Sequence, residues 1–541
     1  MLKRFILGIL FSLLIFGLWE TVFKVVEIDS YSIGECTSNV KNHNPTNLLA
    51  FYYPWYGTPN VSGYWYHWND TNQNDTNHNP DDFLNGERDI AATDYPLLGV
   101  YDSNNETLIE EHIKIAKKAG IDVFVVSWWG IKSFEDKALL HIKNVCEREK
   151  FKFTVYYENT TGVNQTVKDL LYLLNTYANS SMWFRIESRP VIFVYSRAIG
   201  QLKPQMWKTY GNTTYWGLSE DVRENPRYGI FVIEPKQNGI GYIENTESIP
   251  LLSNETYVLR VGISDIRNDC PNFSDVGFRI KIKSENESWN TLDERIVNFD
   301  DGWLDLSYNV SFYAGQNVSI RVESYDGGVK KWCSEWAAVD YFYIENSKGK
   351  IVSPEPYFDN QWKNVVNDLK ERGYNPYFIM DFGDYVNKVR DFARYFLNFT
   401  EGIHDYNPLI FSPYLSDIFN LYKESSNTAH TMNKTFVATV MPGYDDTAVR
   451  SPGHVVDRED GWCYTSLWSI AKASSPDYYV VTSFNEWHEG TEIEPSLEYG
   501  YIYINLTFLN VIPEFSHNML LLLPFFMLLT VLAKLCWKKA G

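Results

Sequence analysis

Eight short apolar segments, rich in β-branched and aromatic residues, recur along this chain and alternate with segments that have helical spacing. Strands that alternate with helices run parallel, because each helix returns the chain to the same end of the sheet. Eight such strands close a sheet into a (β/α)8 TIM barrel, which is therefore the predicted fold. The expected strands are Leu48–Tyr53, Asp122–Trp128, Lys152–Tyr157, Pro190–Tyr195, Tyr377–Asp381, Gly402–Tyr406, Phe436–Met441 and Tyr478–Ser483. The helical segments include Thr107–Ala119, Asp136–Glu149, Trp362–Arg372, Val386–Leu397 and Cys463–Ala473.

The alternation is interrupted between the fourth and fifth expected strands. Residues 206–352 contain short segments of alternating polarity, separated by turns of Gly, Asn and Asp, as in a β-sandwich. We predict an inserted all-β, jelly-roll-like domain that divides the barrel into residues 45–205 and 356–510. The insertion is similar to a carbohydrate-binding module in its tryptophans, and a structural spacer is the alternative interpretation. The tryptophans concerned are Trp303, Trp332 and Trp336.

Both ends of the chain are apolar and carry basic residues. Residues 1–26 begin with a basic pair and an apolar run, which predicts a signal peptide or an uncleaved N-terminal membrane anchor. Residues 511–541 combine Pro513-Glu514-Phe515, an apolar stretch and terminal lysines, and so resemble the PEF-type sorting signals read by archaeal sortase-like enzymes. With the basic residues inside, the sequence predicts a glycoprotein anchored in the membrane at the cell surface, with its barrel outside.

The charge of the chain limits its partners. A formal net charge of −20 argues against nucleic acid and against anionic membrane surfaces as binding partners.

The six cysteines lack metal-ligand spacing, and Cys270 and Cys333 in the insertion are candidates for a disulfide. The aromatic content of 16% favours exposed rings that stack on sugars, in addition to a large aromatic core.

The segment after the last expected strand, SFNEWHEGTEIEP, carries two carboxylates three residues apart, Glu486 and Glu489. Chemistry in these barrels lies at the C-terminal ends of the strands, and a first helical turn would place both on one face. Glycoside cleavage needs a protonated carboxyl group and a second group that helps to displace the leaving group. Close carboxylates raise the pKa of one of them, which suits a retaining pair. The alternative is two solvated loop carboxylates.

The strings FYYPWYG…HWN and SFNEWHEGTEIEP resemble the endo-α-mannosidase family, glycoside hydrolase family 99, over about residues 47–205 and 356–505. The resemblance implies retaining cleavage of α-mannosidic bonds through a 1,2-anhydro sugar, without metal or cofactor. It implies that Glu486 is the base that deprotonates the sugar O2 and that Glu489 is the acid/base at the leaving oxygen. The residues expected to line the site are Glu158, Tyr56, His67, Trp128, Tyr406, Tyr444, Arg450, Trp487 and His488.

Three functions are therefore considered for an extracellular barrel with an oligosaccharide or polysaccharide partner. The first is cleavage of an α-mannosidic bond, the second is cleavage of a different α-linked glycan, and the third is glycan binding without catalysis. The intact set Glu158, Glu486 and Glu489 favours an enzyme, because a barrel without catalytic function would be free to lose one of them.

Overall fold

The computed structural model describes residues 47–511 apart from short internal gaps. Both apolar ends, most of the expected helix Val386–Leu397, Trp332, Cys270 and Cys333 lie outside the described residues, so the predictions for them stay predictions. None of the described helices is long and apolar enough to cross a bilayer. The gaps are residues 70–77, 161, 201, 217–226, 228, 236–238, 268–274, 286, 328–334, 359–360, 383–396 and 412–413.

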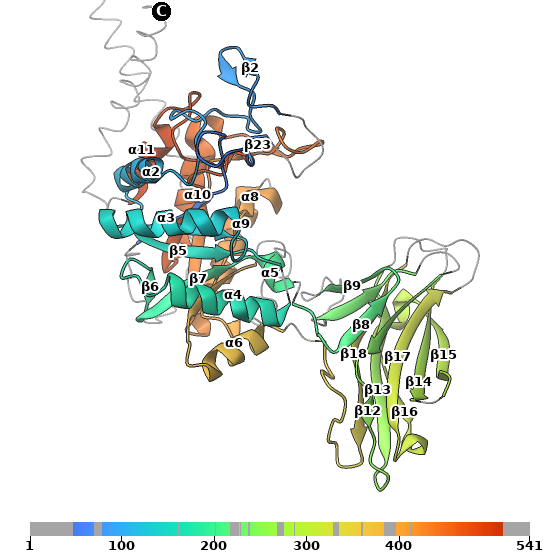
Figure 1. The fold of residues 1–541 in the computed structure, drawn as a ribbon. Coiled ribbons are helices and arrows are strands. Elements are labelled where there is room, and N and C mark those ends of the chain that lie inside the picture. The colour runs from blue at the N-terminus through green and yellow to red at the C-terminus, as the bar shows by residue number, and fades with distance from the viewer. Residues whose placement is uncertain are drawn as a thin grey trace, which may run out of the picture. The chain divides into compact units, whose positions relative to one another are not determined.

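Eight parallel strands form a closed barrel, which confirms the predicted fold class (Figure 1). The strand order is β19-β20-β21-β24-β1-β4-β5-β7, and the pairing of β19 with β7 closes the ring. A short strand, β6 (Arg185–Ile186), pairs antiparallel with β7. The barrel strands are β1 Leu48–Tyr52, β4 Val123–Trp128, β5 Lys152–Tyr157, β7 Arg189–Val194, β19 Tyr377–Asp381, β20 Gly402–His404, β21 Thr435–Val440 and β24 Tyr478–Val481.

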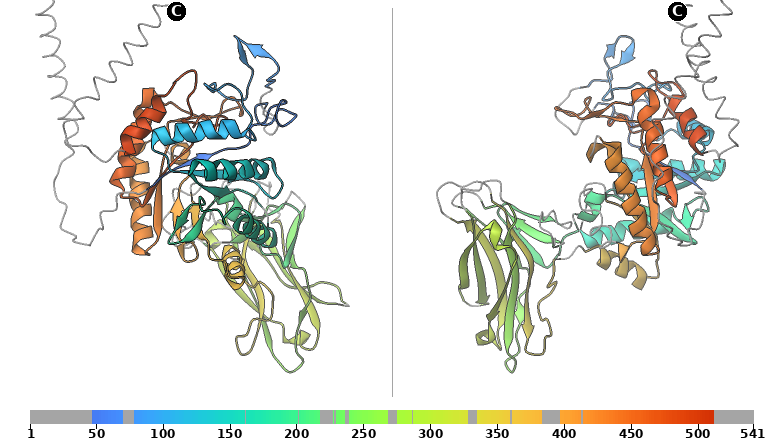
Figure 2. Two further views of the ribbon diagram at one scale, coloured as in Figure 1. Left: turned by 60° about the vertical axis from the view of Figure 1, so that its left-hand side comes forward. Right: turned by 180° about the vertical axis from the view of Figure 1, so that it is seen from behind.

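Helices surround the strands, as Figures 1 and 2 show. The first of them, α2, has the end signals that its sequence predicts: the Asn105 side chain caps the first turn, and Gly120 ends the helix at φ 80°. Buried apolar residues one turn apart, such as Ile109 and Ile113, pack α2 on the barrel. The principal helices are α2 Glu106–Ala119, α3 Phe134–Glu149, α4 Val163–Thr176, α6 Trp362–Glu371, α9 Leu415–Thr431, α10 Trp462–Ala473 and α11 Ile502–Val511.

The barrel strands are buried on both faces. On β4, Val123 and Val125 belong to the cluster inside the barrel, whereas Phe124 and Val126 belong to the cluster between strands and helices. The same alternation continues to the end of the strand, so Ser127 faces inward and Trp128 faces the helices. This alternation decides which residues reach the mouth of the barrel.

The insertion is a β-sandwich of two antiparallel sheets with a core of its own. One sheet has the order β16-β13-β18-β10-β9, and the other has the order β15-β14-β17-β11-β8 with β12 beside β17. The four segments with the clearest alternation are the long strands β13, β14, β17 and β18. The strands are β8 Trp207–Tyr210, β9 Thr213–Trp216, β10 Ile230–Ile233, β11 Ile240–Asn245, β12 Ile249–Pro250, β13 Tyr257–Asp265, β14 Val276–Ser284, β15 Asn290–Val297, β16 Leu304–Asn309, β17 Asn317–Asp326 and β18 Ala337–Asn346.

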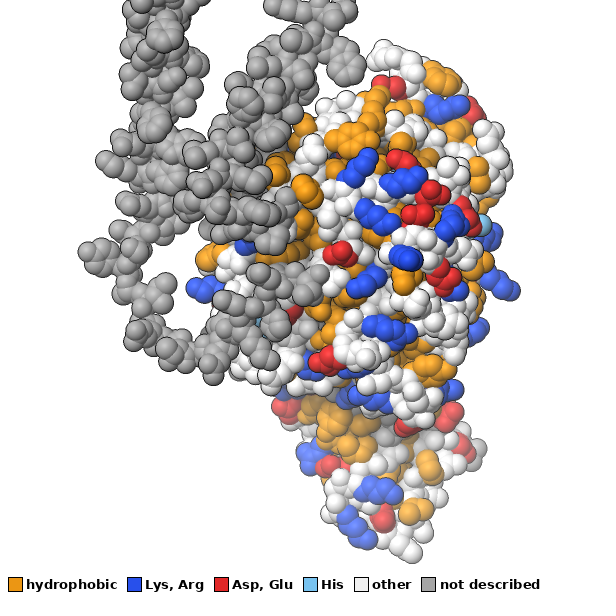
Figure 3. Space-filling model, turned by 90° about the vertical axis from the view of Figure 1, so that its left-hand side faces the viewer, with side chains coloured by type: hydrophobic (Ala, Val, Ile, Leu, Met, Phe, Trp, Pro, Cys, Tyr) orange, Lys and Arg blue, Asp and Glu red, His pale blue; other side chains and the backbone are white. Residues whose placement is uncertain are grey.

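The described surface carries charges of both signs. On the face shown in Figure 3, Lys and Arg side chains lie among Asp and Glu side chains over the barrel and over the visible part of the sandwich. The acidic excess of the chain is therefore mixed with basic side chains on this face.

Candidate active site

The loop that follows β24 is tied to the end of β1 by one asparagine. The side chain of Asn485 accepts a hydrogen bond from the backbone N–H of Tyr53 (2.7 Å) and donates one to the carbonyl oxygen of Tyr53 (3.0 Å). The backbone N–H of Glu486 donates to Ser483 Oγ (2.7 Å), and the N–H of His488 donates to Glu486 Oε1 (3.1 Å). Residues 487–490 form a turn rather than the expected helical turn, because these local bonds replace the helical ones.

Glu486 lies at the bottom of this loop and is 1% exposed. Its Oε1 accepts the bond from His488, whereas its Oε2 is buried without a hydrogen-bond partner among the described residues. Burial, with the nearby charge of Glu489, raises the pKa of Glu486 well above its ordinary value. A buried carboxylate with a free oxygen is suited to accept a proton from a bound ligand.

Glu489 has a different environment, and its side chain is 21% exposed. Tyr406 donates a hydroxyl hydrogen bond to its Oε2 (3.4 Å), and the hydroxyl oxygen of Tyr444 lies 3.5 Å from its Oε1. The guanidinium of Arg450 lies 3.7 Å from Oε1. Burial raises the pKa of Glu489, and the positive charge of Arg450 opposes that rise. Glu489 is therefore a carboxyl group with polar support and access to solvent.

Glu158 completes the cluster of carboxyl groups from the end of β5. It is 5% exposed, and its Oε1 has no hydrogen-bond partner among the described residues. Burial raises the pKa of Glu158 well above its ordinary value, a hydrogen bond from Ser127 lowers it, and the charge of Glu489 raises it further. Glu158 and Glu486 also interact electrostatically, so the three carboxyl groups occupy one site.

An aromatic stack lies beside the carboxyl groups. The ring of His67 is parallel to the indole of Trp55, at 4.6 Å between centroids and 3° between planes, and the ring of His488 lies 5.3 Å from His67 and 6.3 Å from Trp55. His488 Nε2 is 2.6 Å from the carbonyl oxygen of His67. Burial, with the nearby His488, lowers the pKa of His67 well below its ordinary value, so its ring is neutral at neutral pH. Among the described residues, no group of His, Cys, Asp or Glu side chains is arranged to hold a metal ion.

Three of the expected lining residues lie in packed cores instead. Trp128 is fully buried between β4 and the helices, where its Nε1 donates to Asp136 Oδ1 (3.0 Å). Trp487 and Tyr56 are also fully buried; the Trp487 Nε1 donates to Tyr101 (2.9 Å), and its backbone N–H donates to the Tyr56 hydroxyl (3.0 Å). Tyr56 therefore supports the loop that carries Trp487, whereas Trp128 packs against the helices.

Two aromatic residues near the site, Tyr53 and Trp55, belong to the string FYYPWYG but are not among the residues that the sequence predicts to line the site. Burial and the charges of Glu158 and Glu486 raise the pKa of Tyr53 well above its ordinary value, which places its hydroxyl among the carboxyl groups. Trp55 lies 4.6 Å from the Tyr53 ring and stacks on His67. Both residues directly follow β1, and in this type of barrel the residues after a strand form the site, so their position in the sequence could have predicted this role.

A further acidic residue, Asp446, organises the support of Glu489. Its Oδ2 accepts hydrogen bonds from the Tyr444 hydroxyl (2.9 Å) and from Arg450 Nη1 (2.5 Å). Asp446 therefore holds the Tyr444 hydroxyl and the Arg450 guanidinium beside Glu489. The site thus contains Glu158, Glu486 and Glu489 with Tyr406, Tyr444, Arg450, His67 and His488, all eight of which the sequence predicts.

The family model described as "Glycosyl hydrolase family 99" matches residues 44–240 and 407–511, which hold the whole carboxyl cluster. This chain belongs to glycosyl hydrolase family 99. The part of the chain between the two matched stretches contains most of the inserted sandwich, together with the barrel strands β19 and β20 and the site residue Tyr406.

Relatives of this family 99 chain include the "Glycoprotein endo-alpha-1,2-mannosidase" of Mus musculus, 30% identical over 223 residues, or 36% of this chain and 45% of the mouse protein. The human "Glycoprotein endo-alpha-1,2-mannosidase-like protein" is 24% identical over 211 residues, or 35% and 44% of the two chains. The chain thus spans less than half the length of these relatives. The solved "GH99 endo-alpha-mannosidase from Bacteroides thetaiotaomicron" is similar with a TM-score of 0.48 and 18% identity, over 86% of this chain and 96% of that one.

Proposed function

We propose that this family 99 chain is a retaining glycoside hydrolase that cleaves α-mannosidic or closely related α-linked glycans. The observation that carries the proposal is the pairing of two differently held carboxyl groups at one barrel mouth. Glu486 is buried with a free oxygen, whereas Glu489 is partly exposed beside two phenols and a guanidinium. Two carboxyl groups in distinct environments are what separate acid and base roles require.

In the proposed first step, Glu486 removes the proton from the 2-hydroxyl, and O2 attacks the anomeric carbon as the bond to the leaving oxygen breaks. Glu489 gives its proton to that oxygen, which produces a 1,2-anhydro sugar. In the second step, Glu489 deprotonates a water that opens this ring at the anomeric carbon, and Glu486 returns its proton to O2. Two displacements at one carbon retain its configuration.

The proton distribution of the free site has to change before the first step. Burial favours the protonated form of Glu486, and Arg450 favours the ionised form of Glu489. A sugar 2-hydroxyl that donates a hydrogen bond to Glu486 stabilises its ionised form, which leaves the shared proton on Glu489. Substrate binding therefore prepares both groups for their roles.

The proposal is tested by incubating a soluble fragment of residues 27–510 with α-linked manno-oligosaccharides and gluco-oligosaccharides. We expect cleavage of at least one α-mannoside, and its loss in the Glu486→Gln variant. Cleavage of α-glucosides alone would show that the protein is a glycoside hydrolase whose substrate is not an α-mannoside. Binding of a glycan without cleavage of any member of either series would instead support the glycan-binding protein without catalysis.

The apolar ends extend the proposal to the location of the enzyme. The basic residues at both ends and the Pro513-Glu514-Phe515 triplet support a cell-surface protein anchored in the membrane, with processing by a sortase-like enzyme. Mass spectrometry of the protein from the membrane fraction of its source cells tests this proposal. An intact C-terminal peptide from a soluble fraction would contradict it.

A further inference from the structure

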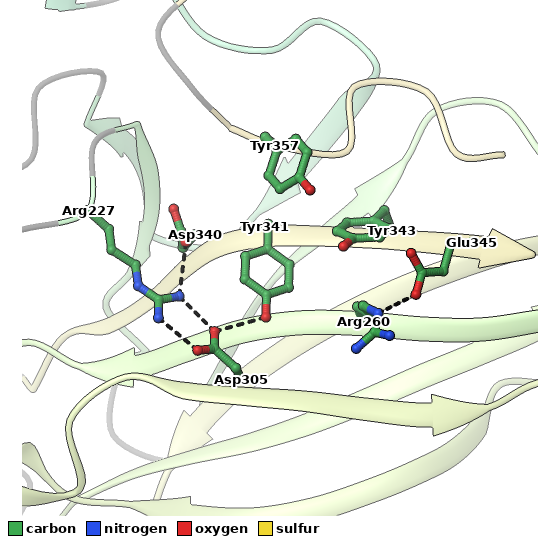
Figure 4. Close-up of a pocket in the computed structure, with 8 residues that line it drawn as sticks. All are labelled: Arg227, Arg260, Asp305, Asp340, Tyr341, Tyr343, Glu345 and Tyr357. Atoms are coloured by element: carbon green, nitrogen blue, oxygen red, sulfur yellow. Dashed lines mark hydrogen bonds and ion pairs between the residues drawn. The ribbon is translucent and has the colours of Figure 1, made fainter. Parts of the chain in front are cut away.

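The outer face of the five-stranded sheet of the sandwich carries a shallow groove of about 670 Å³ (Figure 4). Three tyrosines, two arginines and three carboxylates line it. The groove belongs to the inserted domain, and its residues come from β13, β16, β18 and flanking segments. It therefore shares no residue with the carboxyl cluster of the barrel.

The tyrosines form a connected aromatic surface. Tyr341 and Tyr343 alternate on β18 with Phe342 and Ile344, which point into the sandwich core. Tyr357 approaches them from the segment after β18, with ring centroids 5.4 Å from Tyr343 and 6.2 Å from Tyr341. Tyr357 is 48% exposed, so the groove presents aromatic surface to solvent.

A glycine makes room for part of this arrangement. Gly262 lies on β13 beside Tyr341, where β13 and β18 shift their register. A Cβ at this position would come within 2.7 Å of the Tyr341 ring and 2.9 Å of an Arg227 nitrogen. The close approach of the ring and the guanidinium therefore depends on the missing side chain.

The charged side chains of the groove form ion pairs with one another, and their formal charges nearly cancel. Arg227 binds Asp305 through two hydrogen bonds (2.8 and 3.0 Å), and its Nη1 also donates to Asp340 (3.0 Å). Arg260 Nε donates to Glu345 (2.5 Å). Three carboxylates against two guanidinium groups give a formal charge of −1, which provides no excess positive charge for an anion. Carboxylate and guanidinium groups pair with the hydroxyl groups of a ligand as acceptors and donors, respectively.

Several other aromatic rings of the sandwich are covered by cations. On the six-stranded sheet, Arg321 lies over the rings of Tyr242 (3.8 Å) and Trp289 (4.3 Å). Two of the tryptophans that motivated the comparison with a carbohydrate-binding module are covered in the same way, since Arg227 lies over Trp303 at 4.7 Å and Arg267 over Trp336 at 4.3 Å. Among the described residues, no such cation lies over the three tyrosines of the groove.

We propose that the groove beside Tyr341, Tyr343 and Tyr357 binds a neutral oligosaccharide chain. Sugar rings present C–H faces that pack on aromatic rings, and hydroxyl groups that pair with both carboxylates and guanidinium groups. A neutral polyhydroxylated chain matches both properties of the groove. The site would hold a polysaccharide on the inserted domain, independently of the bond that the barrel cleaves.

The test uses the full chain with Glu489→Gln, so that polysaccharides stay intact, in affinity electrophoresis gels. The gels contain yeast α-mannan, starch, β-glucan, xylan or galactan, with heparin as an anionic polymer. We expect at least one neutral polysaccharide to retard the protein, and Tyr357→Ala and Tyr341→Ala to weaken that binding roughly tenfold. Tyr357→Phe should retain most of it, because the ring is kept.

Tyr210→Ala is the matched control, because Tyr210 is 56% exposed on the six-stranded sheet. Retardation should be unchanged in this variant, and thermal unfolding confirms that each variant is folded. The proposal is wrong if no neutral polysaccharide retards the protein, if heparin alone does, or if the tyrosine variants of the groove bind as the control does. Hydrolysis of small oligosaccharides by the unsubstituted chain is measured separately, so a failed groove and a failed barrel activity give different results.

Discussion

Glu486 and Glu489 are three residues apart in the chain but differ in what surrounds them. Glu486 is 1% exposed and has one oxygen without a partner, whereas Glu489 is 21% exposed and is contacted by Tyr406, Tyr444 and Arg450. A proton donor to a leaving group needs access to that group and to water, which favours Glu489. A base that acts on a hydroxyl of the bound sugar needs a free oxygen directed into the site, which favours Glu486.

The Glu489→Gln variant should lose about 10²- to 10⁴-fold in turnover on substrates with poor leaving groups, because general acid catalysis is removed. Substrate binding should change little, since the amide keeps the size of the side chain. Steady-state kinetics with an alkyl glycoside and with an activated aryl glycoside measure the effect. We expect the aryl leaving group to restore much of the first step, and an equal loss on both substrates would remove the acid assignment.

The pH profile of kcat/KM should be shifted upward compared with that of ordinary carboxyl groups. The productive form of the pair carries one proton, so activity falls when the pair gains a second proton at low pH and when it loses its last proton at high pH. Both pKa values are raised by burial, so both limbs should lie above the ordinary value of about 4.3 for Glu.

The Arg450→Met variant tests the cause of this shift. Arg450 lowers the pKa of both Glu489 and Glu486, so its removal should move both limbs of the profile to higher pH. Arg372→Met, at the residue that caps the C-terminal end of α6, is the control, since Arg372 forms an ion pair with the exposed side chain of Asp368. An alkaline limb that moved to lower pH would contradict the placement of Arg450 beside Glu489.

A 2-deoxy-2-fluoro substrate with a good leaving group separates two roles for Glu486. If Glu486 acts as a base on O2, this substrate forms no covalent adduct, because fluorine cannot become the internal nucleophile. Mass spectrometry of the intact protein and of its peptides measures the outcome. A fluoroglycosyl group esterified to Glu486 would identify this residue as a direct nucleophile instead.

At the scale of single elements, Asn485 joins the loop after β24 to the end of β1. The Asn485→Ala variant leaves the N–H and the carbonyl of Tyr53 unpaired in a buried position, at a cost of about 1–3 kcal/mol for each group. We expect a clear fall in the midpoint of thermal unfolding and a loss of kcat. Asn510→Ala on α11 removes a partly buried bond to the carbonyl oxygen of Leu506 (2.9 Å) and an exposed bond from Lys472 (3.0 Å), and should change stability by less than about 1 kcal/mol. Equal midpoints for the two variants would contradict the role of Asn485.

The barrel strands could be predicted to within about two residues because each is buried on both faces and forms a continuous apolar run. A continuous apolar run, however, does not show which side chains face the inside of the barrel and which face the helices. Trp128 was expected in the site and Ser127 was not, and only the register of β4 decides between them. In the sandwich, short strands such as β8 and β9 carry exposed residues and few apolar ones, so their sequences resemble loops.

At the scale of the whole molecule, the insertion enters and leaves the barrel at one place. The backbone N–H of Gln361 donates to the carbonyl oxygen of Leu202 at 3.4 Å, and both Leu202 and Trp362 belong to the barrel core. The sandwich has its own core, so each part buries its apolar residues separately. Insertions with adjacent ends are removed at little cost to the host fold.

A chain in which a short Gly/Ser linker replaces residues 204–359 should therefore fold. We expect a cooperative thermal transition and a rate on small oligosaccharides within about threefold of the full chain, because the site residues all lie in the barrel. Circular dichroism and steady-state kinetics measure both properties. An unfolded or inactive product would show that the barrel depends on the sandwich for its structure or its site.

The most direct test of the proposed function follows the anomeric configuration of the product by proton NMR while the chain cleaves an α-mannoside. Two displacements at the anomeric carbon, the first by O2 with the aid of Glu486 and the second by water with the aid of Glu489, predict that the α-anomer appears first and mutarotates later. Initial release of the β-anomer would contradict the proposed mechanism. The absence of any cleavage of α-mannosides would contradict the proposed activity.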